Sequence, residues 1–218
     1  MQDYLSPERN RAALLTIDVQ RDFVLPTGPA SSSGATVAVP QIQRLVRAFR
    51  ANNAPIVHAT RLYRCDGSNV DLCHRASIEA GTRIAMPGAL GAELIDEVKP
   101  ENTQRLQPDL LLGGKLQEIG SNEWICYKPR LSAFFQTPIE DHLKSLGITT
   151  IVICGIDFPA SPRSTVYAAS NRDFRILLAT DAISCATDAS LDELAAIGVY
   201  LMGTDQLLDW LSRSRAAA

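Results

Sequence analysis

The sequence predicts an α/β fold, a Rossmann-like three-layer sandwich in which a mostly parallel central sheet lies between two layers of helices. Short apolar runs alternate with stretches whose apolar residues recur at helical spacing. Strands separated by helices pair in parallel through right-handed crossovers. The run at 149–155 is β-branched, apolar and uncharged, as expected of a strand buried on both faces. The length of 218 residues suits one domain over residues 1–218.

The N-terminal elements follow from apolar periodicity and from the residues that end each run. The apolar run at 12–17 ends in Asp18 and predicts a strand buried on both faces. Residues 28–39 are rich in Pro, Ser and Gly and predict a loop. A helix is predicted to begin at Pro40 and to end at a pair of asparagines, before a second strand at 55–60.

The middle of the chain is less regular. Residues 61–91 carry several Gly, Asp and Asn residues and predict a long excursion with one helix. The apolar runs at 110–112 and 124–127 predict short strands. Pro138 is predicted to begin a helix that ends near Leu146, before a glycine.

The C-terminal third repeats the alternation of strand and helix. After the central strand at 149–155 we expect a helix at 162–171 and a further strand at 174–180. Helices at 191–197 and 204–211 complete the predicted fold.

The composition argues against several classes of function. Lys and Arg number 21 and Asp and Glu 24, a formal charge of −3 without a basic run, so neither nucleic acid nor an anionic membrane surface is an expected partner. No apolar stretch reaches the ~20 residues of a membrane span. The polar start lacks the apolar middle of a signal peptide, so we expect a cytoplasmic protein.

The five cysteines predict reduced thiols. Their number is odd, their spacing is scattered, and neither a C-x-x-C motif nor a histidine pair accompanies them. Reduced thiols are typical of the cytoplasm, whereas an oxidising compartment would allow some of them to pair.

Three familiar motifs are absent or incomplete. The segment LGGKL resembles a phosphate-binding loop, but Asp109 and Leu116 stand where that loop needs Gly and Ser or Thr. No G-x-G-x-x-G follows the first strand, which argues against a dinucleotide cofactor. Ser161 lacks the flanking glycines of an α/β-hydrolase elbow.

Polar groups follow three of the predicted strands. Asp18 ends the first strand, Lys128 follows the strand at 124–127, and the segment 156–161 joins the central strand to its helix. In an open parallel sheet, ligands bind at the carboxyl ends of the strands. We therefore expect a carboxylate, an ammonium group and a helix N-terminus to face one cleft, an arrangement suited to a developing oxyanion.

Four segments in order resemble the isochorismatase-like hydrolase family. LTIDVQRDF at 15–23 resembles its D-x-Q-x-D-F signature, and YKPR at 127–130 resembles its lysine segment. GIDFPASPRST at 155–165 resembles its G-(V/I)-x-x-x-x-C-(V/P)-x-x-T elbow, and TDAIS at 180–184 also fits. The resemblance extends from about residue 12 to 202.

The resemblance implies an amidohydrolase of the family's cysteine branch, with a catalytic triad of Asp, Lys and Cys. The cysteine attacks the carbonyl carbon of a small amide or ureide, a thioester forms, and water releases the acid. The family's aspartate corresponds to Asp18 and its lysine to Lys128, whereas its cysteine falls on Ser161. The resemblance further implies a homodimer or homotetramer and no cofactor.

The serine at the nucleophile position has two explanations. It is an engineered cysteine-to-serine substitution, or it is natural and the activity is altered or lost. We favour the first, because such a site is built for a thiolate, which forms far more readily than an alkoxide. With either explanation we expect hydrolysis by Ser161 to be slow or absent.

The expected mechanism gives each group one role. Asp18 takes the proton of the nucleophile and returns it to the leaving amine, for which partial burial would raise its pKa towards neutral. Lys128 holds Asp18 and the nucleophile in place. The backbone N–H groups of Asp157 and Ser161 bind the oxyanion. The family further implies a cis peptide between Ile156 and Asp157.

Candidate substrate contacts are Phe23, Arg61, Asn69 and Phe158, each of which is equally well explained by ordinary packing. His58 is expected to be a hydrogen-bonded core histidine. Nicotinamidases of the family carry a D-x-H metal pair after the second strand. The residues RLY follow that strand here, so we expect neither a metal ion nor a nicotinamide substrate.

Three functions therefore compete. The leading one is a metal-free amidohydrolase with a small amide or ureide substrate. The second is vinyl-ether hydrolysis of isochorismate, for which family members can dispense with the cysteine. The third is a catalytically silent protein that binds a ligand in the retained pocket.

Overall fold

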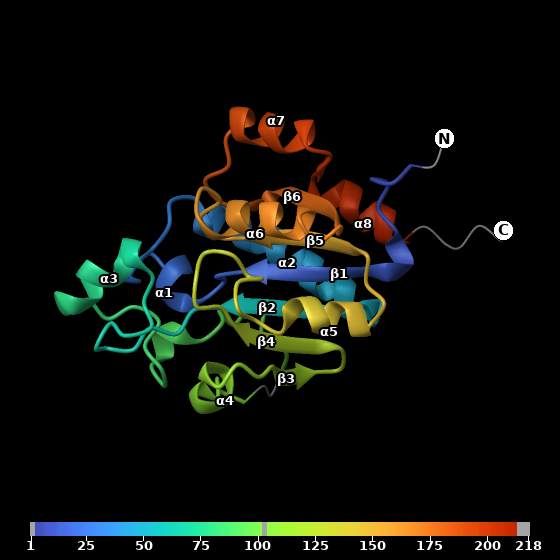
Figure 1. Ribbon diagram of the computed structural model, residues 1–218. Coiled ribbons are helices and arrows are strands. Elements are labelled where there is room, and N and C mark those ends of the chain that lie inside the picture. Colours follow the sequence, from blue (N-terminus) through green and yellow to red (C-terminus); the bar gives the residue numbers. More distant parts are fainter. Residues whose placement is uncertain (1–2, 102–103, 213–218) are drawn as a thin grey trace.

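A seven-stranded sheet forms the centre of the protein, and helices cover both of its faces (Figure 1). The computed structural model describes residues 3–101 and 104–212, so both ends of the predicted domain lie outside the described residues. The strand order is β3-β4-β2-β1-β5-β6-β7. All neighbouring strands pair in parallel except β3 and β4, which are antiparallel. The predicted three-layer fold is confirmed.

The elements have the following bounds. The strands are β1 (Ala12–Ile17), β2 (Ile56–Thr60), β3 (Gln117–Gly120), β4 (Glu123–Tyr127), β5 (Thr150–Gly155), β6 (Arg175–Ile183) and β7 (Tyr200–Met202). The helices are α1 (Arg21–Val24), α2 (Ala35–Ala51), α3 (Leu72–Glu79), α4 (Pro108–Leu112), α5 (Ile139–Ser145), α6 (Ser161–Ser170), α7 (Asp188–Ala196) and α8 (Thr204–Ser212).

Two hydrophobic cores lie on opposite faces of the sheet. One contains the buried faces of α2 and α8 together with much of the excursion that follows β2. The other contains the buried faces of α5, α6 and α7. Successive side chains of β1 alternate between the cores, with Leu14 in the first and Leu15 in the second. Burial on both faces explains why β1 and β5 are continuous apolar runs.

Two predicted elements differ most from the structure, one in type and one in extent. The apolar run at 110–112 belongs to helix α4, because Pro108 is well placed in a first helical turn and a glycine pair ends the helix. Helix α2 begins at Ala35 rather than Pro40, directly after Gly34, which has a left-handed φ of 72°. The short strands β3 and β7 and the short helix α1 were not predicted.

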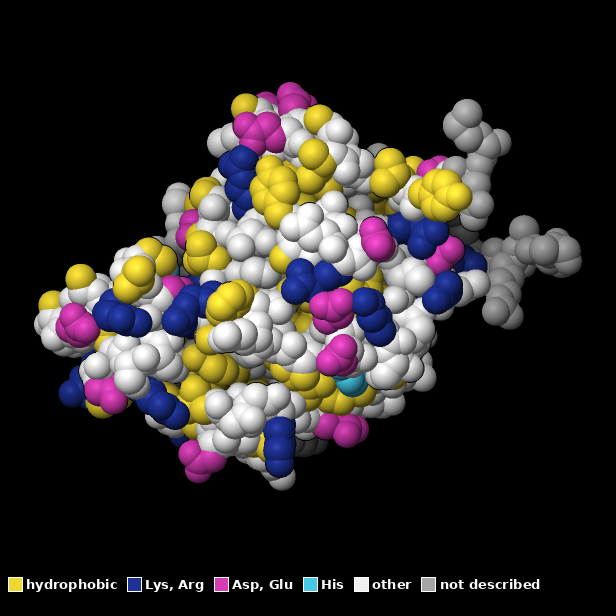
Figure 2. Space-filling view, viewed as in Figure 1, with side chains coloured by type: hydrophobic (Ala, Val, Ile, Leu, Met, Phe, Trp, Pro, Cys, Tyr) yellow, Lys and Arg dark blue, Asp and Glu magenta, His cyan; other side chains and the backbone are white. Residues whose placement is uncertain are grey.

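The surface shows no dominant sign of charge on the face in view. Lys and Arg side chains are interspersed there with Asp and Glu (Figure 2). Within the described residues, a helix with the length and apolar character to cross a membrane is not found.

A polar cluster of four residues joins the sheet to α2, and its three sheet residues are buried. His58 is fully buried on β2, and its ring nitrogens lie 2.8 Å from the hydroxyl of Thr16 and 2.7 Å from Glu123 Oε1. Arg50 donates to both carboxylate oxygens of Glu123, at 2.7 and 2.6 Å. The expectation of a hydrogen-bonded core histidine is confirmed.

Burial raises the pKa of Glu123, but the hydrogen bonds from Arg50 and His58 outweigh it and lower the pKa to about 2. The carboxylate thus stabilises the fold fully above its ordinary pKa of 4.5 and loses this effect as the pH falls towards 2. We predict that Glu123→Gln lowers the free energy of unfolding by about 1–3 kcal/mol at pH 7. Urea unfolding at pH 7 and pH 3 will show a smaller difference at pH 3. Glu118→Gln, an exposed change on β3, serves as the control and has little effect.

Candidate active site

The carboxyl ends of three neighbouring strands bring charged side chains together. Asp18 follows β1, Arg61 follows β2 and Lys128 follows β4. Backbone hydrogen bonds extend the ladder past each strand, from Asp18 N–H to the Ala59 carbonyl at 3.0 Å and from Lys128 N–H to the Thr60 carbonyl at 2.9 Å. Asp18 has a positive φ of 55°, so the chain turns at the carboxylate.

Lys128 joins the two other predicted catalytic residues. Its side chain is fully buried, and Nζ lies 3.0 Å from Asp18 Oδ2. The same nitrogen donates to Ser161 Oγ at 3.0 Å. The structure therefore brings the three residues, which lie far apart in the sequence, into one cluster.

Ser161 is the first residue of α6, and two cations converge on its hydroxyl. In addition to Lys128, Arg61 Nη2 donates to Ser161 Oγ at 2.9 Å. The hydroxyl oxygen has two lone pairs, and each receives a charged donor. The Oγ position is therefore suited to an atom that carries negative charge.

Hydrogen bonds and ion pairs fix both the side chain and the backbone of Arg61. Its Nε lies 3.3 Å from Asp18 Oδ2, and its Nη1 donates to Asp71 Oδ2 and to the hydroxyl of Tyr63. Its backbone N–H and carbonyl both bond to the side-chain amide of Gln20, at 2.7 and 2.8 Å. A residue expected only as a substrate contact is thus part of the charged cluster.

The charges reverse the expected titration of the carboxylate. Burial raises the pKa of Asp18, but the charges of Lys128 and Arg61 outweigh it and hold the pKa below its ordinary value. The expectation that this pKa would rise towards neutral is wrong, because it counted burial without the two cations. Burial and the nearby charge of Arg61 lower the pKa of Lys128 to about 7, against the opposing effect of Asp18. Asp18 is a carboxylate at neutral pH, and the lysine is the group that titrates there.

Two unpartnered polar groups remain beside the cluster. Asp18 Oδ1 is buried and has no hydrogen-bond partner among the described residues. The N–H of Ser161, at the N-terminus of α6, likewise has no acceptor within that part of the chain. A carboxylate oxygen can accept a proton or an N–H group, and a free N–H at a helix start can donate to an oxyanion.

The elbow differs from the expectation in two respects. The N–H of Asp157 donates to the hydroxyl of Ser184 at 2.7 Å, so it is not free to bind an oxyanion. The peptide bonds of the described residues are all trans, so the expected cis peptide between Ile156 and Asp157 is wrong; Asp157 instead has a positive φ of 60°. Of the two expected oxyanion donors, only the N–H of Ser161 remains available.

A cavity of about 340 Å³ opens onto the cluster. Asp18, Arg61 and Ser161 form part of its wall, and Phe23, a candidate substrate contact, also lines it. The remaining lining is mostly small or polar: Ala30, Ser31, Ser32, Ser33, His74, Ile156, Asp157, Ala160 and Cys185. Burial and the charge of Asp18 raise the pKa of Asp157.

A family model supplies the decisive comparison. The model described as the isochorismatase domain matches residues 12–206 of this chain. The chain belongs to the isochorismatase family. This assignment confirms the resemblance of the sequence motifs and places the chain among hydrolases.

Individual members of the family are similar over nearly the whole chain. A probable inactive nicotinamidase of Arabidopsis thaliana is 30% identical over 91% of this chain and 93% of its own length. A ureidoacrylate amidohydrolase of Methylobacterium radiotolerans is 25% identical over 91% of this chain and 75% of its own. The crystal structure of an isochorismatase family protein from Desulfovibrio vulgaris covers 93% of this chain and 99% of its own, with a TM-score of 0.79 and 29% identity.

Two expected substrate contacts of this family member lie outside the cavity wall. The amide of Asn69 bonds to the Leu62 carbonyl at 2.7 Å and to the Tyr127 hydroxyl at 2.9 Å, and thereby orders the excursion after β2. Phe158 is 1% exposed and packs in the core on the α6 face. Both residues support the site from outside the cavity.

Several residues at the site were not expected from the sequence. Asp71 and Tyr63 hold the guanidinium of Arg61, while His74 and Cys185 line the cavity. The excursion that follows β2 supplies three of the four. Its sequence has no regular apolar spacing from which the positions of these side chains could be predicted. The one available signal was the arginine directly after a buried strand, because a buried cation needs anionic partners.

Removal of the lysine charge gives a pH-dependent test of the cluster. Because the folded-state pKa of Lys128 is about 7 and its ordinary value is 10.5, the unfolded chain binds more protons between these values. Stability from this group therefore rises with pH across that range. We predict that the free energy of unfolding of the unmodified protein, minus that of Lys128→Met, grows by about 1 kcal/mol for each pH unit from 7 to 10.

The matched control is Lys144→Met, an exposed lysine on α5 that pairs with Glu140. Its difference from the unmodified protein should stay flat over the same pH range. A flat difference for Lys128→Met as well would contradict the lowered lysine pKa.

Proposed function

We propose that this family member carries a site for the hydrolysis of a carbon–nitrogen bond in a small amide or ureide, and that Ser161 at the nucleophile position leaves this hydrolysis slow or absent. The observation that carries the proposal is the convergence of Lys128 Nζ and Arg61 Nη2 on Ser161 Oγ, at 3.0 and 2.9 Å. Two cations next to one atom would stabilise the negative charge of a thiolate at that position. A hydroxyl oxygen whose lone pairs both accept charged donors is a poor nucleophile.

With a thiol at position 161, the geometry supports a complete reaction. The thiol proton moves to the carboxylate of Asp18, and the thiolate attacks the carbonyl carbon of the substrate. The oxyanion that forms accepts a hydrogen bond from the free N–H at position 161. When the C–N bond breaks, Asp18 returns the proton to the leaving nitrogen, and water then hydrolyses the thioester.

The cavity favours a small, polar substrate with N–H donors. A volume of about 340 Å³ lies at the lower end of the range for small-molecule sites. The unpartnered Asp18 Oδ1 and the exposed carboxylate of Asp157 offer acceptors to amide or ureido N–H groups. The similarity to a ureidoacrylate amidohydrolase supports the same substrate class. The five unpaired cysteines support a cytoplasmic location.

Hydrolysis of a vinyl ether fits the site less well. That reaction needs a group that donates a proton to carbon, whereas the two cations lower the pKa of Asp18 and keep it a carboxylate. Release of pyruvate from isochorismate, measured beside ammonia release from amides, separates the two activities.

The main test places sulfur at the nucleophile position. We predict that Ser161→Cys hydrolyses members of a panel of small amides and ureides about 10²-fold or more faster than the unmodified protein, measured as ammonia release. Mass spectrometry of the quenched reaction will find an acyl group on the peptide that contains residue 161. Ser164→Cys, one turn along α6 and outside this cavity, is the control and should remain inactive. Inactivity of Ser161→Cys on the whole panel, with no acyl adduct, would contradict the proposal.

The role of the carboxylate is tested in the active variant. We predict that Asp18→Asn in the Ser161→Cys protein lowers kcat by about 10²–10⁴-fold, because an amide cannot accept the thiol proton. Circular dichroism of the double variant checks that it folds. Retention of most of the activity would show that another group takes the proton.

A further inference from the structure

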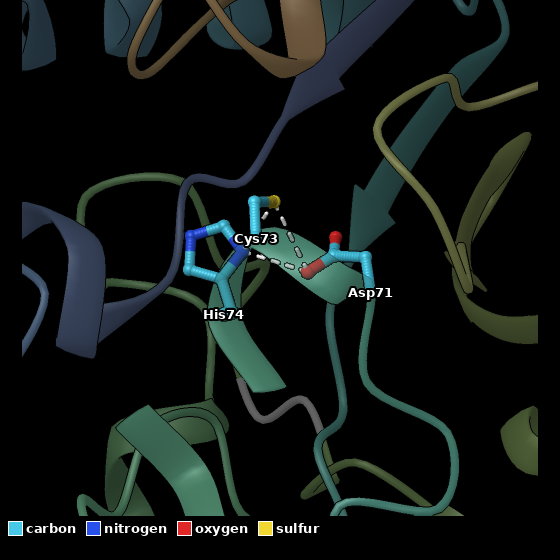
Figure 3. Close-up of side chains that lie close together, drawn as sticks. All are labelled: Asp71, Cys73 and His74. Atoms are coloured by element: carbon cyan, nitrogen blue, oxygen red, sulfur yellow. Dashed lines mark hydrogen bonds and ion pairs between the residues drawn. The ribbon is translucent and has the colours of Figure 1, made fainter. Parts of the chain in front are cut away.

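A second cluster of reactive side chains lies at the start of α3, beside the cavity. Asp71, Cys73 and His74 point their polar atoms towards one another (Figure 3). Asp71 is the residue before the helix, and the other two lie in its first turn. None of the three takes part in the reaction proposed above.

The three atoms have the spacing of ligands around one small cation. His74 Nδ1 lies 2.7 Å from Asp71 Oδ1 and 3.2 Å from Cys73 Sγ, and Sγ lies 3.5 Å from Oδ1. The corners of this triangle are about 1.8 Å from its centre, so a point just above its plane is about 2.0–2.3 Å from all three. These are the distances at which oxygen, nitrogen and sulfur bind zinc.

Hydrogen bonds alone do not account for all three contacts. The imidazole and the thiol can each donate one hydrogen to Asp71 Oδ1. The contact between Sγ and Nδ1 is then left without a hydrogen. A cation above the triangle would satisfy the three atoms together.

The surroundings orient the cluster and give access to it. Asp71 Oδ2 accepts a hydrogen bond from Arg61, and the Tyr63 hydroxyl lies 3.4 Å from both carboxylate oxygens. These contacts fix the direction of Oδ1, as outer partners do at metal sites. His74 lines the catalytic cavity, whereas Asp71 and Cys73 line a second cavity of about 460 Å³. The cluster therefore lies between two cavities, and a fourth position on a bound ion could be reached by water or a ligand.

We infer that Asp71 Oδ1, Cys73 Sγ and His74 Nδ1 form a binding site for a zinc-type divalent cation with one open coordination position. On binding, the Cys73 thiol loses its proton to solvent and the thiolate becomes the ligand. The inference differs from the expectation of no metal ion, and it does not depend on whether residue 161 hydrolyses a substrate.

Cobalt(II) is the probe of choice, because a thiolate ligand gives a near-ultraviolet charge-transfer band. The full chain is freed of metal with a chelator, reduced, and titrated with Co²⁺ and then with Zn²⁺ in competition. We expect one equivalent to bind, the charge-transfer band to appear, and Zn²⁺ to displace Co²⁺. Cys73→Ser should abolish the band, and His74→Ala should weaken Zn²⁺ binding about tenfold or more.

Cys65→Ser is the matched control, since it removes another exposed thiol of the same excursion. This variant should bind as the unmodified protein does. Circular dichroism confirms that each variant folds. Absence of a band in the unmodified protein, or a band that persists in Cys73→Ser, would overturn the inference. Loss of the band in Cys65→Ser would also overturn it, because the ligand thiol would then be a different one.

Discussion

The burial of two cations next to one carboxylate constrains the whole carboxyl edge of the sheet. Lys128 and Arg61 are 0% and 2% exposed, and both lie within 3.3 Å of Asp18 Oδ2. A charge removed from water is tolerated only when its partners are in place, so each member of the cluster depends on the others. Arg61 also reaches Asp71, which places the start of α3 against the strand ends. The same cations that neutralise Asp18 also donate to Ser161. This arrangement keeps the pKa of Asp18 below its ordinary value and favours an anion at position 161.

The central part of the fold could be predicted because it depends on local patterns. Strands β1 and β5 are buried on both faces, and their unbroken apolar runs give their positions within one residue. The edge elements could not be predicted in this way. Strand β7 has three half-buried residues, and the run at 110–112 becomes helical through its flanking Pro and Gly rather than through its apolar character. Helix α2 begins directly after Gly34, which has a positive φ. The Ser- and Gly-rich composition of this segment predicted a loop instead.

Only those site residues that lie at the ends of predicted strands or at the start of a predicted helix could be placed from the sequence. Asp18, Lys128 and Ser161 each follow or begin a regular element, so the topology brings them together, and the structure does place them in contact. Phe158 lies within the elbow motif and Asn69 within the excursion after β2, but Phe158 packs in the core and the amide of Asn69 bonds to the Leu62 carbonyl. His74, Asp71 and Tyr63 come from the excursion after β2, whose path depends on ion pairs and hydrogen bonds rather than on periodicity. The D-x-C-H sequence at the start of α3 contains the three proposed cation ligands. Their side chains come together only because the helix forms and Arg61 holds Asp71.

The most direct measurement of the central claim is the pKa of a thiol placed at position 161. In the Ser161→Cys variant, the rate of alkylation of the peptide that contains residue 161 can be followed against pH by mass spectrometry, separately from the five other cysteines. If Lys128 and Arg61 favour an anion there, the thiol will have a pKa well below the ordinary value of ~8.5 and will react at full rate near neutral pH. A midpoint at or above ~8.5 would show that the two cations do not stabilise negative charge at that atom, and would contradict this account of the site.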